Sequence, residues 1–105
     1  MSVFEKQPGD ILDYDVDLTD WFKPIPGDDI ESVGITVTTD FEAVAALVVG
    51  PEPHPAYVLL GANPKRFKVW LGGGNNFTDY KVTCLVRTEQ DRAKEVEFKI
   101  KVRDK

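Results

Sequence analysis

The chain has 105 residues, the length of one domain, and its hydrophobic fraction of 42% is enough for one hydrophobic core. We therefore expect a single domain over residues 1–105. The formal net charge of −5 argues against nucleic-acid binding, which requires a clustered basic surface. Cys84 is the single cysteine, so an intramolecular disulfide is excluded and folding in a reducing compartment is expected.

The first ten residues contain only two large apolar side chains, Val3 and Phe4, too few for the hydrophobic region of a signal peptide. No apolar run in the chain reaches the length that spans a membrane. We expect a flexible N-terminal arm over residues 1–10, no export by the Sec route and no membrane association.

Strict alternation of apolar and acidic residues predicts a half-buried strand over residues 12–18. Its two faces hold Leu12, Tyr14, Val16 and Leu18 on one side, and Asp13, Asp15 and Asp17 on the other. Residues 19–29 contain two prolines, which argue against a helix. They also contain Trp21 and Phe22, which we expect to close one end of the core.

The next segments are mostly strands. β-Branched residues at alternate positions predict a strand over residues 30–38. Residues 41–49 combine helix-favouring alanines with valines and a closing Gly-Pro pair, and we interpret them as a strand. A proline-rich loop containing His54 follows, and residues 57–60 form a further short strand.

The remaining strands are separated by clear turn signals. Residues 66–71 alternate, and the glycines at 72–74 predict a loop that ends this strand. Residues 80–86 and 96–102 are the clearest strands, joined by a polar hairpin loop at residues 88–92. We expect these two strands to pair antiparallel.

Seven short strands, each with one apolar face, predict an all-β fold: an immunoglobulin-like antiparallel β-sandwich of about seven strands. The residues on the apolar register should form one contiguous core. They are Tyr14, Val16, Trp21, Val69, Tyr80, Val82, Val96, Phe98 and Ile100.

The charges are divided between the two halves of the chain. Residues 1–52 carry twelve acidic and two basic residues, net −10, and residues 53–105 carry six acidic and eleven basic residues, net +5. We expect the three aspartates of the first strand to face, on a neighbouring strand, Lys99, Lys101 and Arg103. The alternative places the two strands at opposite edges, where successive copies would meet head to tail and self-assemble.

Catalytic residues are not expected. The single histidine, His54, lies between two prolines in a predicted surface loop, and a hydrolytic triad needs a positioned base. Cys84 lies on the inward face of a strand, where a free cysteine packs as a small buried hydrophobe. We predict that the protein is not an enzyme; paired carboxylates of the glycosidase kind are the one enzymatic hypothesis left.

Metal and cofactor sites are not expected either. Asp13, Asp15 and Asp17 suggest calcium, but alternate strand positions lie about 6.5–7 Å apart, too far to share one ion. One cysteine and one histidine are too few for zinc. The glycines at 72–74 lack the Lys-Ser/Thr continuation of a phosphate-binding loop. We predict no metal and no cofactor.

Several segments together resemble a known family. They are Leu12-Asp13-Tyr14-Asp15-Val16-Asp17 with Trp21, Val69-Trp70-Leu71-Gly72-Gly73-Gly74, Tyr80-Lys81-Val82-Thr83 and Phe98-Lys99-Ile100-Lys101-Val102. In order and spacing they resemble small immunoglobulin-like structural proteins of tailed bacteriophages, of the fibre-tail adaptor or head-tail module type. The resemblance implies a virion protein, made in the bacterial host cytoplasm, that binds other head-tail or tail-fibre proteins.

Two features depart from that family's pattern. The Ala- and Pro-rich segment 41–64 is longer than expected, and Asp91 stands near a position where the last hairpin often has glycine. The competing hypothesis is a bacterial immunoglobulin-like module that binds proteins or carbohydrate.

Overall fold

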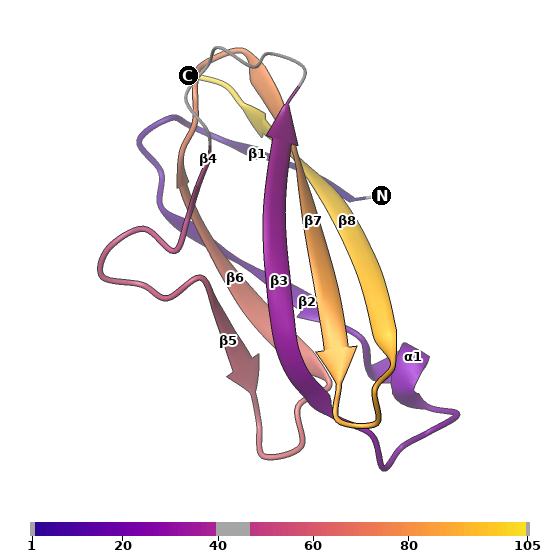
Figure 1. Cartoon of the computed structure of the whole chain (residues 1–105). Helices are drawn as coiled ribbons and strands as arrows, with labels where there is room; N and C mark the ends of the chain where they lie inside the picture. Colours follow the sequence, from indigo (N-terminus) through magenta and orange to yellow (C-terminus); the bar gives the residue numbers. More distant parts are fainter. Residues whose placement is uncertain (1, 40–46, 105) are drawn as a thin grey trace.

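The computed structural model describes residues 2–39 and 47–104, whose strands form two β-sheets packed against each other (Figure 1). The first sheet has the strand order β1-β8-β7-β3, with the bounds Ser2–Lys6, Ala93–Val102, Thr78–Thr88 and Ile30–Thr39. The second has the order β2-β6-β4, with the bounds Leu12–Asp17, Arg66–Gly73 and Leu47–Val49. Strand β5, Tyr57–Leu60, also pairs with β6, and a short helix α1, Thr19–Phe22, follows β2.

This architecture confirms the predicted all-β sandwich. The described residues contain eight strands rather than about seven, because the N-terminal residues form β1. All strand pairs are antiparallel except β1 and β8, which are parallel. The narrower immunoglobulin-like assignment stays a prediction.

The core lies between the inward rows of the two sheets. Its buried residues include Phe67, Val69 and Leu71 of β6, Tyr80, Val82, Cys84 and Val86 of β7, and Phe98, Ile100 and Val102 of β8. The predicted registers of β6, β7 and β8 are therefore confirmed. All nine predicted core residues either belong to this cluster or, like Tyr14, Val16, Trp21 and Val96, are half-buried and pack against it.

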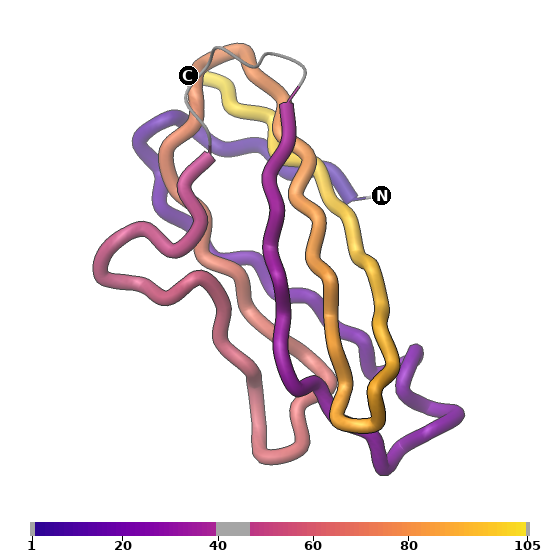
Figure 2. Tube along the Cα trace, in the orientation of Figure 1, coloured from indigo at the N-terminus to yellow at the C-terminus, as the bar shows by residue number. Residues whose placement is uncertain are grey.

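The N-terminal segment does not form the flexible arm that was expected over residues 1–10. Ser2–Lys6 form β1, which runs alongside the C-terminal strand (Figure 2). Lys6 is buried, and its ammonium donates hydrogen bonds of 2.6 Å to the carbonyls of Gln7 and Gly73. Because Gly73 belongs to β6, this lysine ties the first sheet to the second. A strand with only two large apolar residues carries little pattern that would predict it.

Two other local predictions were wrong. The helical turn α1 forms before Pro24, so the prolines limit the length of the helix but do not prevent it. Just before it, the Asp17 carboxylate accepts a 2.9 Å hydrogen bond from the backbone N–H of Thr19, which forms a local turn. Strand β6 continues through Gly72 and Gly73, because β4 pairs with both residues.

The predicted strand at 41–49 is confirmed at Leu47–Val49, and residues 41–46 lie outside the described residues. The predicted hairpin between β7 and β8 is confirmed. Asp91 has a φ of 61°, in the left-handed region where glycine is favoured and aspartate is tolerated. The departure noted at this position is therefore accommodated by the loop.

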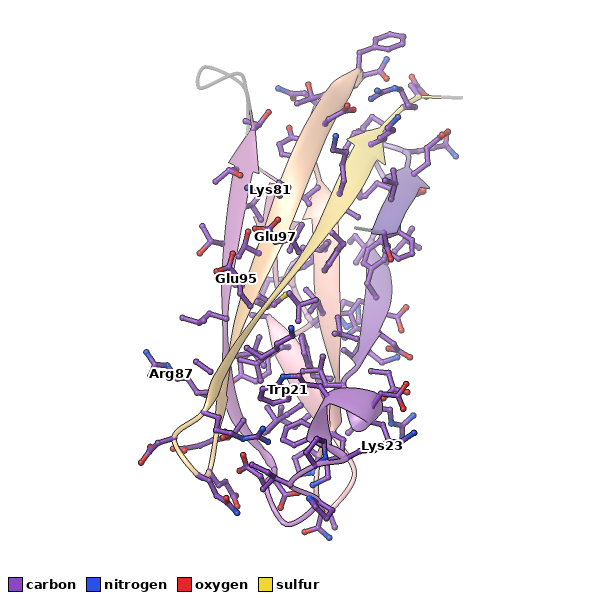
Figure 3. All side chains as sticks on the ribbon, turned by 90° about the vertical axis from the view of Figure 1, so that its right-hand side faces the viewer. Trp21, Lys23, Lys81, Arg87, Glu95 and Glu97 are labelled. Atoms are coloured by element: carbon purple, nitrogen blue, oxygen red, sulfur yellow. The ribbon has the colours of Figure 1, made fainter. Side chains whose placement is uncertain are left out.

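The predicted charge ladder was wrong. β2 belongs to the second sheet, and its Asp13 and Asp15 form ion pairs with Lys68 of β6. The alternative, in which both strands lie at sheet edges, does not hold for β8, because its residues 98–102 lie between β1 and β7 and are paired on both sides. On the outer face of that sheet the Lys81 ammonium instead lies 3.8 Å from a carboxylate oxygen of Glu97 (Figure 3). Charge spacing alone does not reveal which strands are neighbours.

Replacing Phe98 by alanine tests the core register. The side chain is 4% exposed and packs among apolar residues, so its loss should destabilise the fold by about 3–5 kcal/mol. Leu85→Ala is the control, because Leu85 is 40% exposed on the outward register of β7 and should cost under about 1 kcal/mol. Urea unfolding of both variants measures this, and equal costs would contradict the assignment.

Candidate interaction surfaces and a buried ionic cluster

The outer face of the second sheet presents a half-buried tryptophan. Because Phe67, Val69 and Leu71 of β6 point into the core, the alternate residues Lys68 and Trp70 point outward. The His54 ring stacks on the Trp70 ring, with 3.6 Å between centroids and an angle of 3° between planes. The two side chains thus form a flat aromatic pair on the surface.

Backbone hydrogen bonds hold this pair in place. The Trp70 N–H donates to the Ala56 carbonyl at 3.2 Å, and the Trp70 carbonyl accepts from the Gly50 N–H at 3.0 Å. The His54 N–H donates to the Pro51 carbonyl at 2.8 Å. Gly50 has a φ of 68°, and a Cβ there would lie 2.8 Å from the Ala56 nitrogen. Only glycine therefore allows the loop to close over β6.

Apolar side chains surround the aromatic pair on the same face. Val48 lies opposite Gly72 and Val58 opposite Lys68, so both point outward and both are exposed. Ile11 is also exposed and lies beside Gly72: a Cβ placed on Gly72 would be 3.3 Å from the Ile11 side chain. We call these residues the outer patch: Ile11, Val48, His54, Val58 and Trp70.

A charged group borders the outer patch. Lys68 forms ion pairs with Asp13 and, at 3.5 Å, with Asp15. The hydrogen bond from Lys68 lowers the pKa of the Asp13 carboxyl, and the same bond raises the pKa of Lys68. Both groups therefore remain charged at neutral pH. The calcium hypothesis would place these carboxylates around an ion, whereas in the structure Asp13 and Asp15 form ion pairs with Lys68.

A strongly exposed aromatic residue lies in the loop between β6 and β7. Phe77 is 76% exposed and has a φ of 60°, a conformation that bulky side chains rarely adopt. Its backbone N–H donates to the Val102 carbonyl at 2.8 Å and to the Asn76 side chain at 3.0 Å. The Arg103 guanidinium lies 6.0 Å from the centre of its ring. The loop thus holds an apolar side chain out into solvent.

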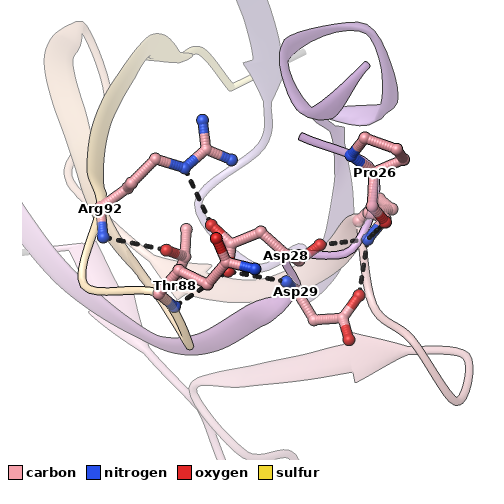
Figure 4. A network of polar contacts seen from close by, with 7 residues as sticks. Pro26, Asp28, Asp29, Thr88 and Arg92 are labelled. Atoms are coloured by element: carbon pink, nitrogen blue, oxygen red, sulfur yellow. Dashed lines mark hydrogen bonds and ion pairs between the residues drawn. The ribbon is translucent and has the colours of Figure 1, made fainter. Parts of the chain in front are cut away.

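At the opposite end of the sandwich, a buried aspartate organises two loops (Figure 4). Asp28 is fully buried, and its carboxylate accepts a 2.8 Å hydrogen bond from Arg92 Nε. The backbone N–H groups of Asp29 and Gln90 donate to the same carboxylate at 3.0 Å each. Lys65 bonds the Pro26 carbonyl at 3.1 Å and the Asp29 carboxylate at 2.6 Å. The cluster joins the segment before β3 to the β7–β8 hairpin.

The cluster also fixes two aromatic side chains. The Arg92 guanidinium lies 4.2 Å above the Trp21 ring, and the Lys65 ammonium lies 4.9 Å from the centre of the Phe22 ring. This agrees with the expectation that these aromatics close one end of the core. The ionic contacts themselves were not predicted, because Asp28 and Arg92 are 64 positions apart and neither belongs to a periodic segment.

The other candidate site residues lie apart from one another. Cys84 is buried in the core, as predicted, and burial raises the pKa of its thiol to about 11. His54 lies in the loop after β4, stacked on Trp70. Across residues 2–39 and 47–104, no group of three or more His, Cys, Asp or Glu side chains is placed to hold a metal ion. Within the same ranges no helix is long and apolar enough to cross a membrane.

The model of one protein family matches residues 6–101, nearly the whole sandwich: the podophage GP4 fiber-tail adaptor protein gp77 family. The chain belongs to this family. The resemblance drawn from the strand motifs is thereby confirmed, and the chain is a structural adaptor protein of a bacteriophage. No curated protein matches the sequence.

The charged Asp28 carboxylate holds two loops of this adaptor together, and protonation of Asp28 in acid should lower the stability of the fold. Burial alone raises the pKa of Asp28, but hydrogen bonds from Thr88, Arg92 and two backbone N–H groups outweigh it and lower the pKa to about 2. The ordinary value in an unfolded chain is about 3.9. The stabilisation is therefore complete above about pH 4 and is lost as the pH falls through about 2.

Asp28→Asn tests this contribution in the adaptor. We expect the variant to be less stable than wild type at pH 7 and to lose less further stability between pH 4 and 2. Urea unfolding midpoints from pH 2 to 7 measure both effects. Asp20→Asn, which removes an exposed carboxylate paired with Lys23, should keep the wild-type profile. A wild-type profile in Asp28→Asn would contradict the assignment.

Proposed function

We propose that the chain is a non-enzymatic component of the virion that links other phage proteins by direct protein–protein binding. Membership of the adaptor family supports this proposal. An adaptor has to bind at least two partners, and it therefore needs more than one contact surface. Such surfaces are built from aromatic and aliphatic side chains that a rigid frame holds at the surface.

The outer patch carries the proposal. The stacked pair His54 and Trp70 is held by backbone hydrogen bonds on both sides, so little side-chain freedom is lost when a partner binds. Tryptophan is among the residues that contribute most to binding energy in protein interfaces. Asp13, Asp15 and Lys68 at its border supply charges that set orientation more than affinity. Phe77, on a different loop, is the candidate anchor for a second partner.

The remaining features are consistent with this role. The proposal includes synthesis in the cytoplasm of the bacterial host without Sec export, since the single cysteine is buried and reduced. It also includes one domain over residues 1–105, no cofactor and no metal. The competing bacterial carbohydrate-binding module is less favoured, because the matching family is one of phage adaptors.

Phage carrying altered copies of the gene test the proposal. Deleting the gene should give particles that lack fibre proteins in mass spectrometry of purified virions. Trp70→Ala should reduce fibre incorporation at least about tenfold, the effect of losing an interface anchor worth more than 1.4 kcal/mol. The control Leu85→Ala, on the outer face of the other sheet, should incorporate fibres normally.

The same experiment can overturn the proposal. Particles that lack the chain yet carry a full set of fibres would show that it is not an adaptor. Thermal unfolding of purified Trp70→Ala is measured in parallel. If the variant folds like wild type and the particles carry normal fibres, the outer patch is not the contact surface.

A further inference from the structure

The edge of the first sheet is only partly covered. β1 pairs with β8 from Phe98, opposite Ser2, to Val102, opposite Lys6. Within the described residues, the preceding part of β8, from Ala93 to Val96, pairs with β7 alone. In the described part of the chain no strand lies on the other side of these four residues, so the backbone N–H and C=O groups that point away from β7, on every second residue, are available for a further strand.

A cavity of about 230 Å³ lies beside this edge, where the two sheets open between β8 and β2. Three aromatic rings line it: Phe4, Tyr14 and Phe98, with centroids 5.1 to 5.9 Å apart. Phe98 is buried, whereas Phe4 remains 39% exposed. The aromatic rings give the cavity one apolar side, and its volume is large enough for one sizeable side chain.

Among the residues that the structure describes, the Tyr14 hydroxyl has no hydrogen-bond partner, although its oxygen is buried. Buried hydroxyl groups in proteins are normally hydrogen-bonded, so an unpaired one marks a place where a partner is missing. Burial and nearby carboxylates raise the pKa of Tyr14, so the hydroxyl keeps its proton and can donate it. A backbone carbonyl of a bound segment would satisfy it.

The lining of the cavity carries acidic charge. Asp15, Asp17 and Glu97 contribute to it, and none of the residues that line the cavity is basic. On the adjoining part of β8 Lys94 is balanced by Glu95, and the Glu97 carboxylate lies 3.8 Å from the Lys81 ammonium. Asp15 is largely exposed although Lys68 lies 3.5 Å away, and the hydrogen bonds from Thr19 lower the pKa of Asp17. The rim therefore favours basic groups over acidic ones.

We propose that this edge groove, formed by Ala93–Val96, Phe4, Tyr14, Phe98 and the acidic rim, binds an extended basic segment of a partner protein. The segment adds a strand to the free part of β8 and places an aromatic or large aliphatic side chain in the cavity. Lysine or arginine residues on either side of it meet Asp15 and Asp17. Backbone pairing supplies affinity and the cavity supplies specificity, as in other cases of strand addition. This inference rests on the proposed adaptor function.

A second copy of the chain fits the groove less well than a basic segment does. The chain has a net charge of −5, and the acidic residues are concentrated in its first half. Association of two copies through an acidic rim is opposed by their like charge. Self-association is therefore an outcome of the test that would count against the proposal.

A synthetic peptide tests the edge groove directly. The probe has nine residues and capped ends, with lysine alternating with valine around one central phenylalanine; in the control peptide glutamate replaces lysine. Each is titrated into the full chain labelled with ¹⁵N. We expect the lysine peptide to shift amide signals of Ser2–Phe4, β2 and Ala93–Phe98, and to bind at least about tenfold more tightly than the control peptide.

Variants of the chain separate charge from fold. Asp15→Lys should weaken binding of the lysine peptide about tenfold, whereas Glu31→Lys, an equal charge change on β3 at the far edge of the sheet, should change it less than twofold. Tyr14→Phe keeps the aromatic ring and should weaken binding a few fold. The amide spectrum of each variant without peptide reports that it is folded.

Each other result overturns the inference. No shifts in the groove at millimolar peptide, equal binding of the glutamate peptide, or shifts confined to β3 would all contradict it. A dimer in sedimentation, together with concentration-dependent shifts of the same amide signals without peptide, would make a second copy the occupant. If phage lacking the chain lose their fibres but the peptide shifts no amide signals of the edge groove, the adaptor function holds and the binding role of the edge groove is wrong.

Discussion

The packing of β6 against β7 and β8 is the contact on which the rest of the molecule depends. The completely buried side chains are Phe67, Val69 and Leu71 on one sheet and Tyr80, Val82, Cys84 and Val86 on the other. Because side chains alternate along a strand, burying one row forces the next row to the surface. Trp70 is on the surface for this reason: its two neighbours in β6 belong to the core.

Polar contacts join the sheets and loops where the apolar core ends. Lys6 connects β1 to Gly73 of β6 at one place, and Asp28 with Arg92 connects two loops at another. The Lys6 and Asp28 side chains are buried, and both make several hydrogen bonds, which a buried charge needs. Such contacts have demanding geometry, so they specify one arrangement of the loops in addition to the stability that they contribute.

The sequence was sufficient to predict the core and most strands. The registers of β6, β7 and β8 follow from period-two patterns, since a shift by one residue would bury lysines such as Lys99. The same reasoning could not predict which strands are neighbours, so Asp13 and Asp15 were matched to the wrong lysines. Lys68 was the true partner, and it lies on a strand whose apolar pattern had been recognised.

The candidate contact surfaces were harder to predict than the core, for a physical reason. The outer patch depends on a stack between His54 and Trp70, which the loop closed by Gly50 brings together. Seen only as a residue between two prolines, His54 carried no signal of an aromatic partner. The edge groove depends on where β1 begins relative to β8, and the parallel pairing of a weakly patterned strand is not visible in a list of residues.

The two surfaces differ in what they ask of a partner. The outer patch is a flat face made of side chains, and a partner has to match its shape over a folded surface. The edge groove combines a free strand edge with a single cavity, so an unfolded segment with the right alternation is enough to fill it. A protein that joins two components of a particle benefits from this difference. A rigid contact sets the geometry of one junction, and a strand-adding contact accommodates a partner whose linking segment orders only on binding.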